Sequence, residues 1–306
     1  MIAGPAIQKT DLPLKLFHRG KVRDTYELSD ERLLMVTTDR LSAFDHVLPN
    51  GIPDRGKVLT QLSVFWFSQT HHFQENHLVS GMVPDLPPAL RDHRDELTGR
   101  FMIVRKAKRI DFECVVRGYL AGSAWKEYEE SHTLAGEQMP PGLRQSEKLA
   151  YPIFSPATKA ETGHDENITF AQMSKEVGPD LATRMRDASL ELYKYGSELA
   201  ERRGIILADT KFEFGLIDDS LVLIDEVMTP DSSRFWDAAA YVVGTSPQSY
   251  DKQFVRDWLE RSGWDKESDP PALPPDIVAQ TRDRYLAAYQ MIVRKPLFPP
   301  KARNEK

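Results

Sequence analysis

The sequence predicts an α+β protein of two lobes built on antiparallel sheets, and three observations support this. The chain has 306 residues, more than one hydrophobic core usually serves, which favours two lobes. Its first third alternates β-prone runs with short turns, a pattern typical of antiparallel hairpins. Its second half contains long stretches with apolar residues at helical spacing, and between them another predicted hairpin.

Composition and charge exclude several classes of protein. A hydrophobic content of 41% with 28% charged residues is ordinary for a globular chain and excludes wholesale disorder. The net charge of −6 argues against a nucleic-acid partner. Cys114 is the only cysteine, which excludes an intrachain disulfide and a cysteine-based zinc site. No run reaches the roughly 20 apolar residues of a membrane span, and the first residues do not resemble a signal peptide. We therefore expect a cytoplasmic protein without a membrane partner.

The individual elements follow from local patterns. In the first half we expect strands at 15–18, 22–28, 32–38, 101–104 and 114–116, a helix at 59–73, and a proline-rich surface excursion at 139–156. In the second half we expect a helix at 179–203, a hairpin of 205–214 with 221–224, a helix starting near Phe235, a proline-rich linker at 263–275 and a last helix from Pro274.

The predicted hairpin at 205–224 carries the clearest chemical signal. Asp209, Lys211 and Glu213 alternate along one strand and share one face, whereas Phe212 and Phe214 point to the other face, into a core. Carboxylates on a stiff strand beside a lysine suit Mg²⁺ held against nucleotide phosphates. A solvated strand face with cross-strand ion pairs remains an equal alternative on spacing alone.

The return strand of this hairpin ends in a second acidic pair, Asp225-Glu226. A three-residue loop from Asp218 to Ser220 would place Asp225 opposite Glu213, and a two-residue loop would separate them. We prefer the three-residue loop because it gathers the carboxylates into one site.

Glycine-containing turns suggest two anion sites. The turn at Gly20 could lay backbone N–H groups and Lys21 over phosphates, although a plain hairpin turn is the stronger interpretation on spacing alone. The run 117–123 holds Arg117 between a strand and two glycines, where a guanidinium can bind phosphate or carboxylate. An exposed arginine at a simple strand-to-helix turn explains this run equally well.

Two polar segments complete the candidates. Residues 231–234, Asp-Ser-Ser-Arg, precede the helix expected near Phe235, so they suit either an anion site or an ordinary helix cap. The segment 155–168 is polar and rich in turn residues, as lids and binding loops often are, but a plain surface loop has the same composition. His164 within it is a candidate base.

Together these segments resemble one family closely, the phosphoribosylaminoimidazole-succinocarboxamide synthase (SAICAR synthetase) family. The resemblance runs from about residue 15 to about residue 295 and keeps five signature runs in order. These runs are 20–24, 38–45, 113–123, 209–215 and 225–234.

The resemblance implies a fold, a division and a reaction. The fold is the two-lobed, ATP-grasp-like α+β architecture with ATP in the interlobe cleft. Residues 1–110 would form a β-rich lobe covering the nucleotide phosphates, and residues 111–306 an α+β lobe with the metal hairpin, the ribotide site and the C-terminal helices. The reaction joins L-aspartate to 5-amino-1-(5-phosphoribosyl)imidazole-4-carboxylate (CAIR) with ATP and Mg²⁺, through an acyl phosphate.

The resemblance also implies roles for individual residues. Catalysis falls to Lys211, Glu213 and Asp225, with the metal on Glu213 and Asp225. ATP binding falls to Lys21, Arg23, Glu113, Asp209, Lys211 and Asp225. Substrate binding falls to Asp39, Ser42, Asp45, Arg117, Ser123 and Arg234, the last three on the ribotide phosphate. A lid over the cleft would carry Lys159, His164, Asp165 and Glu166.

Two other functions share part of this pattern. A small-molecule kinase on a related scaffold would use the ATP residues and stop at phosphorylation, but it has no need of the group Arg117, Ser123 and Arg234. A nucleotide-binding regulatory protein has no need of an intact Lys21, Glu213 and Asp225. We expect the ligase, acting as a monomer on small molecules.

Overall fold

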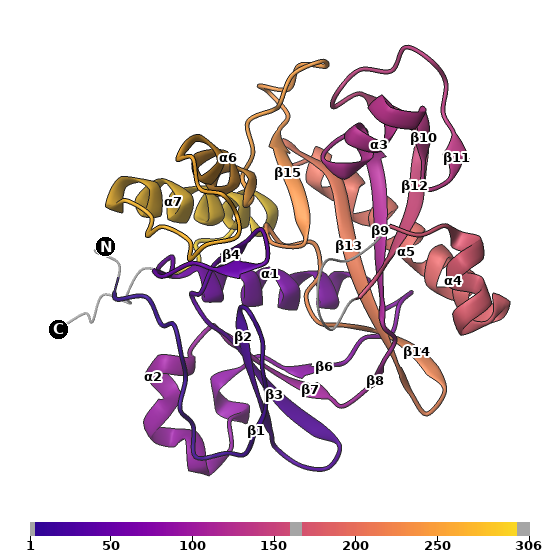
Figure 1. Ribbon diagram of the computed structural model, residues 1–306. Coiled ribbons are helices and arrows are strands. Elements are labelled where there is room, and N and C mark those ends of the chain that lie inside the picture. Colours follow the sequence, from indigo (N-terminus) through magenta and orange to yellow (C-terminus); the bar gives the residue numbers. More distant parts are fainter. Residues whose placement is uncertain (1–3, 160–166, 299–306) are drawn as a thin grey trace.

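A computed structural model describes residues 4–159 and 167–298 of the chain. Within them the fold is α+β, as the sequence predicts, with two main antiparallel sheets and helices packed around them (Figure 1). In the described part of the chain, no helix is both long and apolar enough to cross a membrane.

The first sheet is built from the N-terminal part of the chain, in the order β1-β2-β3-β7-β6. Alternation along β7 gives it two buried faces: Met102 and Val104 pack toward helix α1 (Arg55–Thr70), and Phe101 and Ile103 pack into a separate core with Leu34. The strands are β1 (Leu16–Arg19), β2 (Arg23–Glu27), β3 (Arg32–Thr37), β6 (Leu78–Ser80) and β7 (Phe101–Arg105).

The second sheet has the order β12-β9-β13-β14, and β13 also pairs with β8 and β15. Helix α5 (Pro179–Glu201) contacts β13, β9 and β12, so it covers one face of this sheet. The strands are β8 (Lys108–Arg109), β9 (Phe112–Tyr119), β12 (Lys148–Thr158), β13 (Ile205–Ile217), β14 (Ser220–Ile224) and β15 (Ser233–Asp237).

One edge of β13 has two successive partners. Its first half pairs with β15, as far as Thr210 opposite Ser233, and its second half pairs with β14, starting at Glu213 opposite Ile224. Between these partners the chain leaves the sheet at residue 225 and returns at residue 232. This loop lies beside the face of β13 that α5 does not cover, and it supplies part of the candidate site.

The helices connect the two sheets. Helix α1 reaches the loop at 225–232 through Trp66, whose indole N–H donates to the Met228 carbonyl at 3.0 Å. Helices α6 and α7 pack back onto residues 41–52 of the N-terminal part. The division of the chain into two lobes at residue 110 stays a prediction. The helices are α1 (Arg55–Thr70), α2 (Arg94–Leu97), α3 (Ser123–Ser131), α4 (Phe170–Val177), α5 (Pro179–Glu201), α6 (Gln253–Arg261) and α7 (Pro275–Val293).

Two of our predicted elements are wrong. The surface excursion expected at 139–156 ends in strand β12, whose prolines Pro152 and Pro156 are tolerated because β12 is an edge strand. The helix expected near Phe235 is strand β15, in which Phe235 and Trp236 are buried and pair with β13. Short polar capping residues before two aromatic residues suit either element, so the pairing with β13 decides.

Candidate active site

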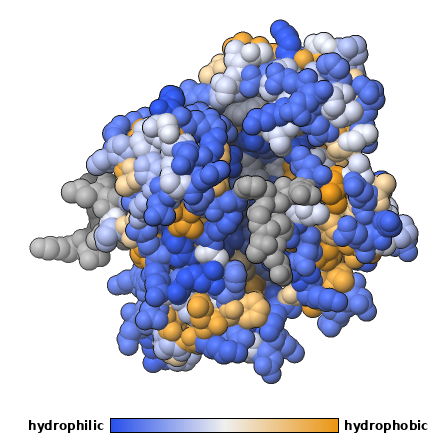
Figure 2. Space-filling view, viewed as in Figure 1, coloured by the Kyte–Doolittle hydropathy of each residue, from blue (hydrophilic) through white to orange (hydrophobic). Residues whose placement is uncertain are grey.

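A cavity of about 1250 Å³ opens between the two sheets. Figure 2 shows this face of the molecule hollowed near its centre, with a mostly hydrophilic rim. Among the described residues, eleven lysine and arginine side chains and eight carboxylate side chains line the cavity. The chain as a whole carries a net charge of −6, so its cations are concentrated here. A cavity with this charge favours anionic ligands.

Neighbouring strands β9 and β13 form the wall of the cavity. The alternation of β13 places Asp209, Lys211 and Glu213 in the wall and Phe212 in the core, as the sequence predicts. Strand β9 alternates in the same way and adds Glu113, Val115 and Arg117 to the wall. Lys211 pairs with Glu113 across the two strands.

The predicted register of the hairpin is wrong by one residue. Glu213 pairs with Ile224 and not with Asp225, because the loop has two residues, Asp218 and Asp219, with φ of 48° and 62°. Aspartate tolerates this left-handed backbone, and such two-residue loops match the twist of the strands.

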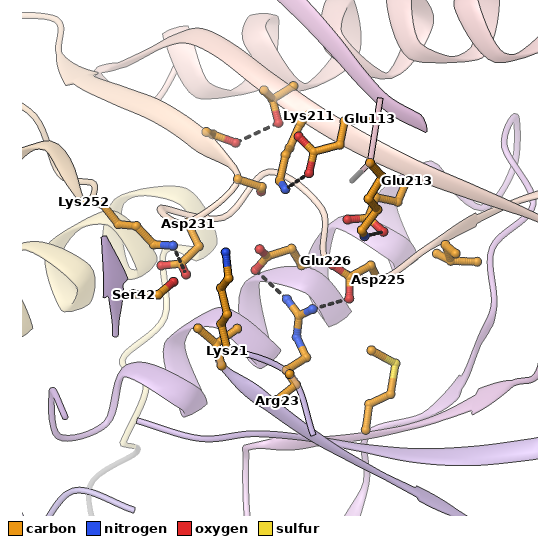
Figure 3. Close-up of a pocket in the computed structure, with 18 of the residues that line it drawn as sticks. Lys21, Arg23, Ser42, Glu113, Lys211, Glu213, Asp225, Glu226, Asp231 and Lys252 are labelled. Atoms are coloured by element: carbon orange, nitrogen blue, oxygen red, sulfur yellow. Dashed lines mark hydrogen bonds and ion pairs between the residues drawn. The ribbon is translucent and has the colours of Figure 1, made fainter. Parts of the chain in front are cut away.

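Asp225 nevertheless reaches the cavity by another route. Its backbone is left-handed, with φ of 66°, which turns the chain away from β13 just beyond Ile224. Figure 3 shows the Asp225 carboxylate in the cavity on the same side as Glu213. The two carboxylates repel each other electrostatically, and this repulsion contributes to the raised pKa of Glu213. The predicted grouping is therefore confirmed, although its structural cause is a bend and not strand pairing.

Cations from elsewhere in the fold neutralise these carboxylates. Arg23, on β2 of the first sheet, crosses the cavity to Asp225 and lies 2.9 Å from Glu226. Lys159, just beyond β12, pairs with Glu213. Figure 3 shows Arg23 forked between its two partners. The first sheet thus contributes a guanidinium to a carboxylate group held by the second.

Burial and charge perturb the titration of this group. Burial, followed by repulsion from Asp225, raises the pKa of Glu213. Burial would also raise the pKa of Asp225, but Arg23 and Lys159 outweigh it and lower that pKa to about 2. Burial works to lower the pKa of Lys211, yet Glu113 and Glu213 raise it. Lys211 is therefore charged and Asp225 ionised at neutral pH.

A second group of cations lies along the same wall. Arg117 Nη2 donates to Ser123 Oγ at 3.1 Å, and its Nη1 lies 3.5 Å from Asp209. Arg234, on β15, donates to Asp209 at 2.5 Å. Two guanidinium groups therefore share one carboxylate, which leaves a positive charge in excess. A Cβ at Gly122 would lie 2.1 Å from Arg234 Nη2, so the glycine allows this close approach.

The substrate residues predicted near 38–45 divide into two groups. Ser42 and Asp45 line the cavity, and Lys21 pairs with Asp45 at 2.5 Å. The prediction for Asp39 is wrong, because its carboxylate is fully buried away from the cavity lining. It accepts hydrogen bonds from the Gly56 N–H at 2.9 Å and from Arg100 at 3.0 Å. Asp39 therefore anchors the first turn of α1.

The lid prediction falls mostly outside the described residues. His164, Asp165 and Glu166 lie in the segment 160–166, which the structure does not describe. Lys159 is described and points into the cavity toward Glu213.

The cavity contains functional candidates that our sequence reasoning missed. Glu226 and Asp231 were part of a quoted signature run but had no assigned role. Asp251, Lys252 and Arg256 lie just before and within the first turn of α6. One polar cluster beside a helix does not by itself indicate a function. An apolar wall was missed as well, because its members come from four separate strands. They are Leu33, Met35, Val104, Val115 and Ile224.

A family model described as SAICAR synthetase matches residues 16–271. The chain belongs to the SAICAR synthetase family. It is 51% identical over 288 residues to a phosphoribosylaminoimidazole-succinocarboxamide synthase of Syntrophobacter fumaroxidans, covering 94% of this chain and 95% of the relative.

Solved structures of the family share the fold. The SAICAR synthase of Saccharomyces cerevisiae in complex with SAICAR is 44% identical, has a TM-score of 0.87, and is matched over 95% of this chain and 99% of that one. A SAICAR synthetase in complex with ADP is 24% identical with a TM-score of 0.68, over 91% and 98% of the two chains. The family and the α+β fold expected from the sequence are therefore confirmed.

Proposed function

We propose that this chain is an ATP-dependent ligase of purine biosynthesis, which joins L-aspartate to CAIR and releases SAICAR, ADP and phosphate. Family membership supports the ligase and does not favour the kinase alternative. The observation that carries the proposal is that one cavity holds two separate groups, a carboxylate-lysine hairpin and an arginine-serine group. A ligase that activates a phosphorylated substrate with ATP needs both.

The nucleotide half of the proposed site lies between the two sheets, in an ATP-grasp-like arrangement. The apolar wall beside Glu113 offers a surface for a base, and Lys21, Arg23 and Lys211 supply positive charge for phosphates. Asp209 and Asp225 complete the nucleotide residues. Residues 1–110, which contribute Lys21 and Arg23, would cover the phosphates. The ADP of the related structure agrees with a nucleotide in this fold.

Mg²⁺ fits the carboxylate group beside the nucleotide half. In the described ranges, no three histidine, cysteine or acidic side chains are arranged as a ready metal site. Glu213 and Asp225 nevertheless offer the hard oxygen donors that Mg²⁺ prefers, and Mg²⁺ commonly takes only one or two carboxylates together with phosphate oxygens. Burial and the repulsion from Asp225 together raise the pKa of Glu213, and a cation would relieve the repulsion. A bound Mg²⁺ would neutralise charge on the transferring phosphoryl group.

The proposed reaction has two steps. A carboxylate oxygen of CAIR attacks the γ-phosphorus of ATP, the bond to the leaving ADP oxygen breaks, and an acyl phosphate forms. The amine of aspartate then attacks the acyl carbon, loses a proton, and expels phosphate that carries the former carboxylate oxygen. Lys211 stabilises negative charge on the phosphoryl group. Glu213 and Asp225 hold the neighbouring cations Lys159 and Arg23 in place.

The remaining proposals concern the ribotide, the lid and the setting. Arg117, Ser123 and Arg234 would bind the ribotide phosphate, and Ser42 and Asp45 would line the substrate side. Lys159 and the adjoining residues 160–166 would exclude water from the acyl phosphate. We propose a cytoplasmic monomer that acts on small molecules, without nucleic acid or membrane, in keeping with its acidic charge.

An omission assay tests this function. The purified chain is supplied with ATP, Mg²⁺, CAIR and L-aspartate, and ADP and SAICAR are measured by chromatography. We expect one ADP for each SAICAR, and no SAICAR when any substrate is left out. ADP formation that continues at the full rate without aspartate would support the kinase, and no ADP under any condition would support a regulatory nucleotide-binding protein.

A further inference from the structure

A buried arginine, Arg40, lies behind the turn between β1 and β2 and does not itself line the cavity. Its Nη2 donates to the Gly20 carbonyl at 3.0 Å, and its Nε donates to the Lys21 carbonyl at 3.1 Å. Its Nη1 donates to the Gln8 carbonyl at 2.5 Å, and Nη2 also donates to Asp24 Oδ1 at 2.8 Å. One guanidinium therefore ties this turn to the N-terminal segment and to β2.

The positive charge of Arg40 is held in a buried ion pair. Its partner Asp24 is fully buried and also accepts the Thr10 N–H at 2.9 Å and Arg19 Nε at 3.0 Å. Burial would raise the pKa of Asp24, but the hydrogen bonds from Arg40 and Thr10 outweigh it and lower that pKa. Asp24 is therefore ionised at neutral pH, and the effect of Arg40 on the cavity passes through the carbonyls that it binds.

These two carbonyls determine where two N–H groups point. The C=O and N–H groups of a planar trans peptide point in opposite directions, and no peptide bond among the described residues is cis. The N–H groups of Lys21 and Val22 therefore point away from Arg40, toward the cavity that residues 20–22 line. Within residues 4–159 and 167–298, neither N–H group has a hydrogen-bond partner.

The side chain of Lys21 faces the same space as these N–H groups. Figure 3 shows Lys21 reaching from the first sheet into the cavity. Successive N–H groups that point the same way form a concave site for an anion, and a nearby lysine strengthens it. Such a site needs a fixed backbone, yet Gly20 leaves the turn free to change conformation. The contacts of Arg40 with both carbonyls remove this freedom.

We infer that Arg40 is a positioning residue for the nucleotide phosphates, which directs the N–H groups of Lys21 and Val22 at phosphate oxygens without touching them itself. The inference rests on the proposed function, which places the phosphates beside Lys21. It requires an arginine, because the planar guanidinium presents Nε and Nη2 to both carbonyls in fixed directions. A lysine would keep the charge beside Asp24 but lose this geometry.

Calorimetric titration of ADP and of adenosine into Arg40→Lys tests this inference. Misaligned contacts to a charged phosphate should weaken ADP binding roughly 10- to 150-fold, the usual value of a charge-assisted contact. Adenosine has no phosphate, so its affinity should stay within about twofold of the wild type. KM for ATP should rise with the loss of ADP affinity, and KM for CAIR should stay within about twofold.

Arg100→Lys is the matched control. Arg100 is also a buried arginine of the first sheet, and it donates to the Thr37 carbonyl at 3.3 Å and to Asp39 at 3.0 Å. This variant should lose stability in urea denaturation as Arg40→Lys does, but it should keep the ADP affinity of the wild type. An equal loss of ADP affinity in both variants would indicate a general defect of the sheet and overturn the inference.

Amide hydrogen exchange of the wild type, followed by NMR, makes the test independent of how the variants fold. The amides of Lys21 and Val22 should exchange more slowly with ADP bound and at an unchanged rate with adenosine bound. Equal rates with both ligands would overturn the inference.

The outcomes distinguish this inference from the proposed function. Unchanged ADP affinity in Arg40→Lys, or an equal loss for ADP and adenosine, would overturn the role of Arg40. A wild-type protein that binds ADP but forms no SAICAR would refute the proposed ligase, while the nucleotide titrations would still decide the role of Arg40.

Discussion

Gly122→Ala should weaken CAIR binding without changing a single charged residue. Gly122 precedes α3 with φ of 58° and ψ of −128°, a backbone region open almost only to glycine. Its added Cβ would lie 2.1 Å from Arg234 Nη2 and 2.5 Å from Cζ. Ordinary contact needs about 3.4 Å or more, so the guanidinium must move by more than about 1 Å. This movement breaks its alignment with Asp209 and with the proposed ribotide phosphate.

Two losses follow from this geometry and are measured separately. The strained backbone should lower the free energy of unfolding by about 1–3 kcal/mol. The displaced Arg234 should lower CAIR affinity roughly 10- to 150-fold, the usual value of a charge-assisted contact, and should leave ATP affinity unchanged. Calorimetric titration with each ligand measures the second loss, and urea denaturation measures the first.

Gly142→Ala is the matched control. Gly142 also has a positive φ, of 84°, but nothing lies within 4 Å of its would-be Cβ. It should therefore share the loss of stability and keep its affinity for CAIR. Equal CAIR affinity in the Gly122 and Gly142 variants would refute the placement of Arg234 on the ribotide.

Three further predictions address the rest of the cavity. Glu213→Gln should lower kcat by on the order of 100-fold or more at saturating Mg²⁺ with the fold intact; near-normal turnover would exclude Glu213 from the metal and phosphoryl site. Arg117→Ala should raise KM for CAIR by roughly 10- to 150-fold and spare KM for ATP; an equal rise in both constants would place it elsewhere. His77, buried in the cavity wall, has its pKa lowered to about 4 by burial, so the stability it contributes as a neutral ring is present above about pH 6.5 and is lost as the pH falls toward 4. Between pH 7 and pH 5, the free energy of unfolding of His77→Gln, measured by urea denaturation, should therefore fall by about 2 kcal/mol less than that of the wild type. Equal falls in both proteins would contradict the buried neutral imidazole.

Local patterns of the sequence predicted much of the site. The alternation of Asp209, Lys211 and Glu213 with apolar residues needs only the two-residue period of a strand, and the structure places all three in the cavity wall. The same period explains Glu113 and Arg117 on the neighbouring strand. These predictions succeeded because side chains alternate between the two faces of a strand, and this alternation does not depend on residues distant in the chain.

The features that failed depend on fine backbone geometry or on long-range packing. The register of the hairpin turned on whether Asp218 and Asp219 alone adopt left-handed backbone, which composition does not decide. Asp39 looked like a ligand because it belongs to a signature run, but it is bound by Arg100 and by the start of α1. The place of Lys252 was hidden because α6 packs against residues 41–52, some 200 residues earlier in the chain.

Transfer of an oxygen atom from CAIR to phosphate tests the central claim most directly. In the proposed reaction the carboxylate oxygen that attacks ATP leaves on the phosphate. The purified chain is therefore supplied with CAIR labelled with ¹⁸O in both carboxylate oxygens, together with ATP, Mg²⁺ and L-aspartate, and the released phosphate is analysed by mass spectrometry. We predict one ¹⁸O in the phosphate for each SAICAR formed. Phosphate without the label would contradict the acyl phosphate, and ATP turnover without SAICAR would contradict the ligase itself.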